Sequence, residues 1–345
     1  MKCVRYFFIV MFMLLLMTPK PGWVAQEAAG SAKETAASAE KEAGKGEETS
    51  GRGEGFETKA EETKEGEECP ATFGPIITDT AVPIDKGGFA IQPTFGMGFV
   101  VDSLTPNWRR ETAGGNFKSF GMEWKFTYGL WDNLESFVVI PYTHNWAGDV
   151  NEPGPNGERS ADYGGLGDIN LTLKYRLVEE TEKRPTVTAL FATDFPTGKF
   201  RHLNPGNLGT DEIGGGAYVF TTGLNLSKYM RPFIVYGNLW YSVQTDYSSD
   251  DGRQHPRDCV TLNLAAEYPM TKKWVALLEF VSCWDGGRLF GHKSNTPPGA
   301  LVSVVPGIEY MATDKFSLAL GLNIDMVGKN TDATITPLLS MVYAF

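Results

Sequence analysis

The 345-residue sequence has no apolar run long enough to cross a bilayer as a helix. The run YFFIVMFMLLLM has twelve residues, from Tyr6 to Met17, whereas a transmembrane helix needs about 20. Lys2 and Arg5 precede this run and TPKPG follows it, which is the arrangement of a signal peptide. We therefore expect residues 1–25 to be a signal peptide that sends the chain to an oxidising compartment. An uncleaved N-terminal membrane anchor is the alternative.

Basic residues are also scarce. The chain has 31 Lys and Arg against 42 Asp and Glu, for a net charge of −11. Binding to nucleic acid depends on clustered cations that neutralise phosphates. The charge balance therefore argues against nucleic acid as a partner.

Motifs for catalysis, metal binding and haem attachment are missing. The sequence has no G-x-S-x-G, no H-x-x-H and no C-x-x-C-H, so we expect no enzyme, no cofactor and no metal site. The four histidines fall in or beside predicted long loops: His144, His202, His255 and His292. His144 beside Asn145 resembles part of the Ser-His-Asn set of outer-membrane phospholipases, so a barrel hydrolase remains an alternative.

Residues 26–68 have a composition unlike the rest of the chain. They include thirteen Glu, six Lys or Arg and one aromatic residue. Such a segment cannot bury enough apolar surface to offset its conformational entropy, which predicts disorder. We interpret it as a spacer, with binding to a partner as the alternative.

From about residue 87 onward, the sequence alternates between polar and apolar residues. In GLGDINLTLKYRL, one register reads Asp168, Asn170, Thr172, Lys174 and Arg176, and the other holds only apolar residues from Ile169 to Leu177. This period of two indicates a strand with one polar and one apolar face. Twelve such segments begin near residues 88, 117, 134, 166, 185, 213, 232, 258, 274, 301, 315 and 333.

The connections between these segments alternate between short turns and long polar loops, which is typical of an outer-membrane β-barrel. Aromatic residues in the apolar register gather beside the short turns: Tyr128, Tyr175, Phe233, Tyr268, Trp274, Tyr310, Phe316, Tyr343 and Phe345. They predict an aromatic girdle at one membrane interface. The sequence thus predicts an all-β fold over residues 69–345. This fold is a closed, antiparallel, up-and-down transmembrane barrel of about twelve strands.

Several stretches follow one another in a familiar order: GPIITDTAVPIDKGGFAIQ, YGLWDNLESFVVIPY, GLGDINLTLKYRL and DFPTGKF. They resemble the outer-membrane transporter family labelled for the meta-pathway of phenol degradation, from about Gly74 to Phe345. The resemblance implies a twelve-stranded barrel in a Gram-negative outer membrane that moves small, often aromatic, compounds. It brings no catalytic or binding residues with it.

Charged residues in the polar register are the candidates for lining the lumen. The main candidates are Glu123, Lys125, Asp168, Lys174, Arg176, Glu279, Glu309 and Asp325, joined by Glu135, Asp194 and Glu267. They form either a polar path for solute or a mutually satisfied network that fills a narrow barrel.

Cys259 and Cys283 lie on the two strands of one predicted hairpin. If the hairpin is symmetric about Thr271, the two cysteines face each other on the luminal side, which predicts a disulfide. Two free thiols are the alternative.

The sequence therefore favours a passive outer-membrane channel or transporter for small molecules, and the resemblance implies aromatic or hydrophobic ones. A plugged structural or adhesive barrel is the first alternative. The expected partners are outer-membrane lipid, a small-molecule solute, and the barrel assembly machinery, which would recognise the terminal Phe345.

Overall fold

The computed structural model describes residues 72–250, 252–290 and 293–345. The expected signal peptide, the acidic segment 26–68 and His292 lie outside these residues. Twelve long strands form the barrel: β1 Phe89–Leu104, β3 Asn116–Trp131, β4 Leu134–Gly148, β6 Ile169–Val178, β7 Thr186–Phe195, β8 Val219–Met230, β9 Phe233–Gln244, β12 Cys259–Pro269, β13 Trp274–Asp285, β16 Gly299–Thr313, β17 Phe316–Lys329 and β18 Thr331–Ala344.

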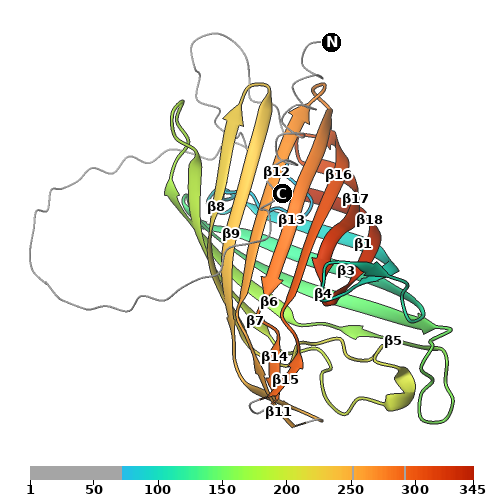
Figure 1. The fold of residues 1–345 in the computed structure, drawn as a ribbon. Helices are drawn as coiled ribbons and strands as arrows, with labels where there is room; N and C mark the ends of the chain where they lie inside the picture. The colour runs from blue at the N-terminus through green and yellow to red at the C-terminus, as the bar shows by residue number, and fades with distance from the viewer. Residues whose placement is uncertain (1–71, 251, 291–292) are drawn as a thin grey trace, which may run out of the picture. The chain divides into compact units, whose positions relative to one another are not determined.

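The twelve strands close into a barrel. Each long strand pairs antiparallel with its sequence neighbours, and β18 returns to pair with β1, from Ala90 opposite Ala344 to Leu104 opposite Thr331. Figure 1 shows β18 beside β1, where the ends of the sheet meet. Closure leaves no free sheet edge, so backbone groups need no partner from outside the barrel. The predicted twelve-stranded barrel is confirmed.

The alternating pattern of β6 separates the two faces of the wall. Leu171 and Leu173 are 39% and 41% exposed, whereas Thr172 and Lys174 are 2% and 1% exposed. The same contrast recurs around the barrel, where Phe191, Leu224, Leu239 and Leu262 are all exposed. The exposed apolar residues thus form an outer belt, and the polar register faces the lumen, as the sequence predicts.

Aromatic side chains collect at the short-turn end. Trp274 and Tyr310 have ring centroids 4.6 Å apart, and Phe233 and Tyr268 lie 5.4 Å apart. Phe345 contacts Phe89 at 5.3 Å, which joins the last residue to the first strand. These residues form the girdle expected of a membrane interface.

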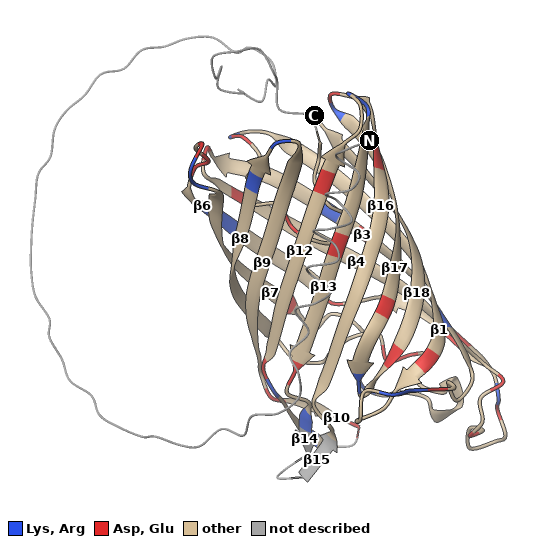
Figure 2. Cartoon of the chain, turned by 45° about the horizontal axis from the view of Figure 1, so that its top comes forward, with Lys and Arg blue, Asp and Glu red and all other residues tan. Residues whose placement is uncertain are grey.

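The connections differ in length at the two ends, and Figure 2 shows charged residues both in these connections and as single bands on the long strands. The turn between β3 and β4 has two residues, whereas the connection from β7 to β8 spans 196–218 and contains the short helix η1 Pro205–Asn207. Among the described residues, no helix is long and apolar enough to cross a membrane.

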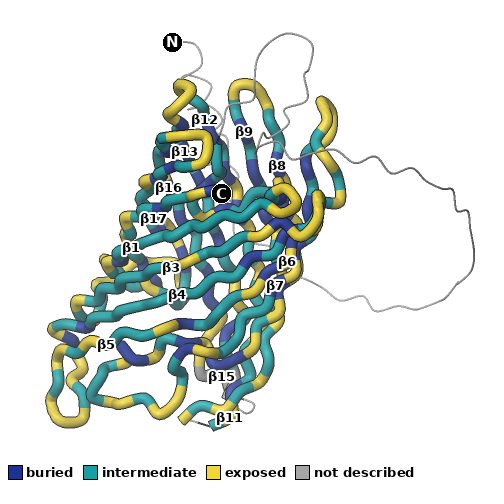
Figure 3. Tube along the Cα trace, turned by 180° about the vertical axis from the view of Figure 1, so that it is seen from behind, coloured by how far each residue is buried: buried dark blue, intermediate teal, exposed yellow. Residues whose placement is uncertain are grey.

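Shorter strands build up the long-loop end. β2 Arg110–Glu111 extends the β1 side, and β5 Ala161–Leu166 extends β4. β10 Tyr247–Ser249, β11 Gly252–Pro256, β14 Arg288–Phe290 and β15 Lys293–Thr296 form a separate four-stranded sheet beyond the barrel. In Figure 3, exposed residues are concentrated in the turns and loops at both ends.

Two predicted strand starts are wrong. The strand expected from residue 213 begins at Val219, because Gly198 and Gly215 donate their backbone N–H groups to the Asp168 carboxylate at 2.8 and 2.7 Å. These bonds hold the 197–218 connection as a loop. The strand expected from residue 166 begins at Ile169 for the same reason, so Asp168 lies outside the strand in which it was predicted to face the lumen.

The predicted β12–β13 register is also wrong. Cys259 pairs with Asp285 and Thr261 pairs with Cys283, a shift of two residues. The turn is centred on Lys272 rather than Thr271, because the Met270 N–H donates to the Trp274 carbonyl and the Thr271 hydroxyl accepts from the Lys273 and Trp274 N–H groups. A shift of two keeps both cysteines on the luminal face.

Candidate functional site

Residues 72–88 run inside the barrel before β1 begins, and we call them the luminal segment. Most backbone N–H groups between Phe73 and Ile84 bond to side chains of the wall rather than to its backbone. Luminal side chains accept these N–H groups: Glu309 from Phe73, Glu279 from Ile76, Ile77 and Thr78, Asn238 from Asp79, Ser227 from Ala81 and Glu135 from Ile84. A buried backbone amide needs such a partner, so the polar register of the wall serves as a binding site for this segment.

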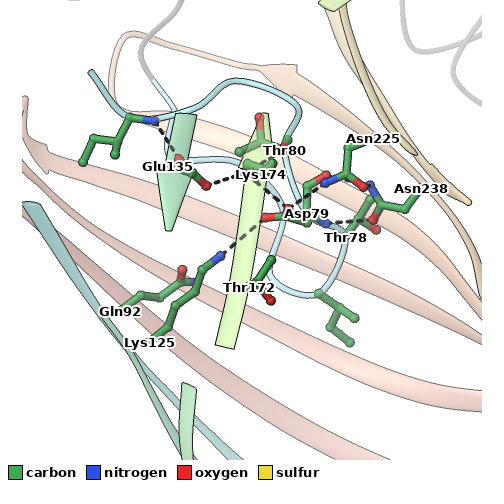
Figure 4. Close-up of polar contacts among 12 residues, drawn as sticks. Thr78, Asp79, Thr80, Gln92, Lys125, Glu135, Thr172, Lys174, Asn225 and Asn238 are labelled. Carbon is green, nitrogen blue, oxygen red and sulfur yellow. Dashed lines mark hydrogen bonds and ion pairs between the residues drawn. The ribbon is translucent and has the colours of Figure 1, made fainter. Parts of the chain in front are cut away.

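Asp79 is the charged centre of this arrangement. Its carboxylate accepts hydrogen bonds from the Lys174 ammonium at 3.2 Å, the Lys125 ammonium at 3.4 Å and the Asn225 amide at 2.7 Å. Asn238 binds the same residue through its backbone, accepting the N–H at 2.9 Å and donating to the carbonyl at 2.8 Å. Figure 4 shows these side chains converging on Asp79 from several strands.

Lys174 joins Asp79 to the barrel wall. Its ammonium also contacts Glu135 at 2.7 Å and the Thr80 carbonyl at 2.9 Å. Two cations and two carboxylates therefore meet in this part of the lumen, with no net charge. Buried charges persist in a protein when they are paired in this way.

Apolar contacts fix the luminal segment on either side of Asp79. Ile76 packs against a buried cluster of Val275, Leu277 and Ala319 on β13 and β17. Ala81 is fully buried, and the Thr188 hydroxyl donates to its carbonyl. Ile76 is partly buried, so its packing contributes less than the roughly 1.5–3 kcal/mol of a fully buried Ile side chain.

The luminal segment leaves the lumen across Gly129 at the rim. The Gly87 N–H donates to the Gly129 carbonyl at 2.8 Å, and the Gly129 N–H donates to the Gly88 carbonyl at 3.0 Å. A Cβ atom at residue 129 would lie 1.9 Å from the Asp85 carbonyl oxygen. Gly129 therefore permits a close approach that no other residue type allows.

The luminal segment lies in one half of the barrel. Each wall residue that binds it is within six positions of a strand end beside a short turn, as with Glu309 near the end of β16 at Thr313. The half of the lumen near the long loops is lined by other residues than those that bind the luminal segment. The segment thus narrows the lumen at the short-turn end.

The other predicted lumen residues have separate roles. Glu123 lies in the luminal register and is exposed, next to Lys125. The Asp325 carboxylate accepts from Ser303 at 2.6 Å and from the Thr334 hydroxyl at 2.8 Å, which ties three strands together. Glu267 accepts from the Tyr236 hydroxyl at 3.0 Å. Only Glu123 among these three faces open space.

Two further candidates sit at the edges of β6 and β7. Asp194 accepts from the Asn170 amide at 2.7 Å, which joins neighbouring strands. Arg176 donates to the Asp132 carbonyl at 3.2 Å and lies 3.7 Å from Glu179, so it belongs to the short-turn rim. The prediction that Arg176 lines the lumen stays a prediction, and its side chain reaches the neighbouring turn at this rim.

The long connection 196–218 folds against the lumen at the other end. The Asn145 amide on β4 donates to the Thr210 carbonyl at 3.1 Å, and the Lys199 ammonium lies 2.6 Å from the Asp211 carboxylate. Burial opposes ionisation of Asp211, but the hydrogen bonds from Lys199, Asn204 and Asn207 and the charge of Lys199 together outweigh it and lower the pKa of Asp211. The hydrogen bond to Asp211 raises the pKa of Lys199. This ion pair holds the loop in shape across the neutral range.

The Sγ atoms of Cys259 and Cys283 lie 2.9 Å apart as thiols. They are diagonal neighbours on β12 and β13 rather than directly opposed. The disulfide stays a prediction, now with a different register.

The histidines lie at the long-loop end. His144 points outward, where Nε2 contacts the Asp162 carboxylate at 3.0 Å, whereas Asn145 points inward to Thr210. The two residues of the phospholipase comparison therefore face opposite sides of the wall. Among residues 72–250, 252–290 and 293–345, no three His, Cys, Asp or Glu side chains group as metal ligands.

The role of the luminal segment was missed in the sequence. Asp79, Asn225 and Asn238 were not identified, although GPIITDTAVPID has no strand alternation and precedes the first strand. The excess of luminal Glu residues over luminal cations was a second sign in the sequence that something else occupies the lumen. Those carboxylates need donors, and the backbone of residues 73–78 provides them.

The barrel is similar to solved outer-membrane proteins. An outer membrane channel from Pseudomonas putida F1 aligns with a TM-score of 0.64 at 14% identity, covering 79% of this chain and 100% of that one. The translocator domain of the autotransporter NalP from Neisseria meningitidis has a TM-score of 0.45 at 13% identity, covering 76% and 90%. The toluene transporter TbuX from Ralstonia pickettii has a TM-score of 0.41 at 10% identity, covering 76% and 90%. The first similarity supports the barrel fold.

The sequence itself matches a family over most of the barrel. Residues 112–334 fit the family described as "Putative MetA-pathway of phenol degradation", which is more than half of the chain. Together with the closed twelve-stranded barrel, this match shows that the protein belongs to that family.

Proposed function

We propose that this protein is a passive channel for small molecules in the outer membrane of a Gram-negative bacterium. The observation that carries the proposal is a closed barrel with an apolar outer belt and a polar lumen that the luminal segment narrows at one end. The outer belt suits lipid, because it presents exposed Leu, Phe and Tyr side chains around the wall. Downhill diffusion needs no energy-coupling motif.

The fold relative supports a channel, since the P. putida protein is described as an outer membrane channel. Short turns face the periplasm in outer-membrane barrels. The luminal segment then sits at the periplasmic half, and the solute meets the long loops first. Selectivity would come from the radius of the path and the charge around Glu123 and Lys125.

A plugged structural barrel is a second candidate, because the luminal segment is held by hydrogen bonds from several strands and by two ion pairs. The two candidates differ in whether this segment moves. We propose that it moves enough to admit small solutes.

Membership of the phenol-pathway family favours small aromatic solutes over sugars. Phe345 would serve as the recognition residue for the barrel assembly machinery, since its ring is exposed beside Tyr343 and its N–H donates to the Phe89 carbonyl at the closure seam.

The test is flux through the purified protein. Planar-bilayer conductance and liposome swelling with aromatic and sugar solutes should show passage, with aromatic solutes favoured. A double variant, Thr80→Cys with Ser227→Cys, would tether the luminal segment to β8, because these two hydroxyls lie 3.5 Å apart. Oxidation of this variant should reduce conductance and reductant should restore it. No conductance in any state would favour the structural barrel.

A further inference from the structure

The ladder between β1 and β3 is interrupted near the long-loop end. Pairing is regular from Phe89 with Tyr128 to Phe99 with Lys118, and it resumes on β2 at Ser103 with Glu111. Three residues of β1, 100–102, therefore face six residues, 112–117. On its other side, β1 shifts register against β18 between Val100 and Asp102, so Val101 pairs with neither neighbour. We call this place the ladder gap.

A cavity lies beside the ladder gap on each face of the wall. The outer cavity has a volume of about 410 Å³ and is lined by Met97, Asn116, Lys118, Trp146, Gly148 and Ser160. The inner cavity has a volume of about 240 Å³ and includes Val100, Phe117, Ser119 and Asn145, with Leu208 and Thr210 of the long loop. Lys118 and Trp146 line both.

The register assigns these cavities to opposite sides of the wall. Lys118 is directly opposite Trp146, and both belong to the outward register, whereas Ser119 and Asn145 form the next, inward pair. Lys118 and Trp146 border both cavities and pair regularly with each other, so the interruption lies on the β1 side of Lys118. Hydrogen bonding between strands seals a barrel wall. Other ladders have shifts of one or two residues, whereas at the ladder gap three residues face six.

The inner cavity continues toward open lumen along β3. Gly121 follows Ser119 in the inward register, and a Cβ atom placed on it would meet nothing within 4 Å. It pairs with Gly96, so neither strand presents a side chain here. Glu123, the next inward residue, is exposed. Open space therefore lies beside Gly121, between the inner cavity and Glu123.

We propose that the ladder gap is a lateral portal through which small apolar molecules pass between the lumen and the outer leaflet of the membrane. This inference rests on the proposed channel function and adds a route and a solute class to it. Met97 and Trp146 give the outer mouth an apolar lining, and the Lys118 ammonium can turn to the headgroup region while its alkyl chain covers apolar surface. A polar solute has no reason to leave the lumen by this route, because the lipid side offers it no hydrogen bonds.

The decisive experiment closes the portal reversibly. Val100→Cys with Phe117→Cys places two thiols across the gap, at the pair that would come next if the β1–β3 register continued. The matched control, Phe95→Cys with Met122→Cys, crosslinks directly opposed residues of the same two strands within the regular ladder. Both pairs are made with all natural cysteines replaced by serine.

Two readouts separate the portal from the channel. Ionic conductance in planar bilayers reports the lumen, and uptake of the fluorescent apolar probe 1-N-phenylnaphthylamine by intact cells reports apolar transfer. Oxidised Val100→Cys/Phe117→Cys should keep its conductance, while probe uptake falls to that of cells without the protein and recovers with reductant. The oxidised control should keep both. Equal probe uptake by the oxidised portal and control pairs would overturn the portal.

If the two introduced cysteines do not crosslink, a variant that fills the outer cavity provides the test. Asn116→Trp places a large side chain in the outer cavity, and Val243→Trp places one on β9, half-way round the barrel on the exposed outer face. Asn116→Trp should lower probe uptake several-fold and Val243→Trp should not. Equal uptake would also overturn the portal. If the natural protein conducts ions but takes up no probe, the portal is refuted and the channel stands. If it shows neither conductance nor probe uptake, the channel itself is refuted.

Discussion

Asp79 is the residue whose charge determines how firmly the luminal segment is held. Replacement by asparagine keeps the shape of the side chain but removes the carboxylate that Lys125 contacts and leaves Lys174 with Glu135 alone. Disrupting a buried ion pair by removing one partner costs about 3–5 kcal/mol. We expect Asp79→Asn to weaken the seating of the segment and to raise the mean conductance in planar bilayers.

Asp85→Asn is the matched control, because Asp85 is exposed near the end of the same segment. It should conduct like the natural protein. If the two variants give equal conductance, the Asp79 cluster does not control the width of the lumen.

Cys259 and Cys283 should form a disulfide in an oxidising compartment, since their Sγ atoms are already in contact. The bond links 24 positions of chain, which corresponds to roughly 3 kcal/mol against unfolding in the chain-entropy description. Peptide mass mapping of unreduced protein should recover the two cysteines in one linked peptide pair. Alkylation of both thiols without reductant would contradict the prediction.

Sequence reasoning succeeded unevenly for these residues. Polar alternation placed Lys125, Lys174, Glu279 and Glu309 on the luminal face, because a period of two follows from strand geometry alone. It could not indicate what they bind. Their partner, the luminal segment, is more than 40 positions away in sequence and has no pattern of its own.

The strands are the scale at which the sequence is most informative. Starts at Leu134 and Trp274 were predicted without error, and most others lie within two positions. The failures have local causes. Gly214 to Gly216 permit a loop that hydrogen bonds to Asp168 hold in place, and the Thr271 hydroxyl shifts the centre of a hairpin. The alternation of polar and apolar residues cannot predict the hydrogen bonds of single side chains.

The two faces of a strand should respond differently to the same charge. Leu171→Arg puts a cation on the outer belt of β6, which costs roughly 2–4 kcal/mol near the middle of the bilayer. Glu123→Arg puts the same side chain into the open part of the lumen, where water can solvate it. Folding yields in lipid vesicles should therefore fall for Leu171→Arg and change little for Glu123→Arg. Equal yields would mean that the faces are assigned the wrong way round.

The whole molecule is a closed barrel, and closure gives it resistance to detergent. Every long strand is paired on both sides, including β1 with β18. Unboiled protein in dodecyl sulfate should therefore keep its strands and migrate differently from boiled protein. The same mobility before and after boiling would contradict a closed membrane barrel.

The partners of the luminal segment are spread around the circumference, from Glu135 on β4 to Glu309 on β16. The segment precedes every strand in the sequence, yet most of its binding site exists only after the later strands have taken their places. Its docking energy thus becomes available late in assembly, once the wall is nearly complete. A barrel in which a late strand such as β16 is displaced would also lose the Glu309 contacts of the segment, so we expect assembly of the wall and filling of the lumen to be coupled.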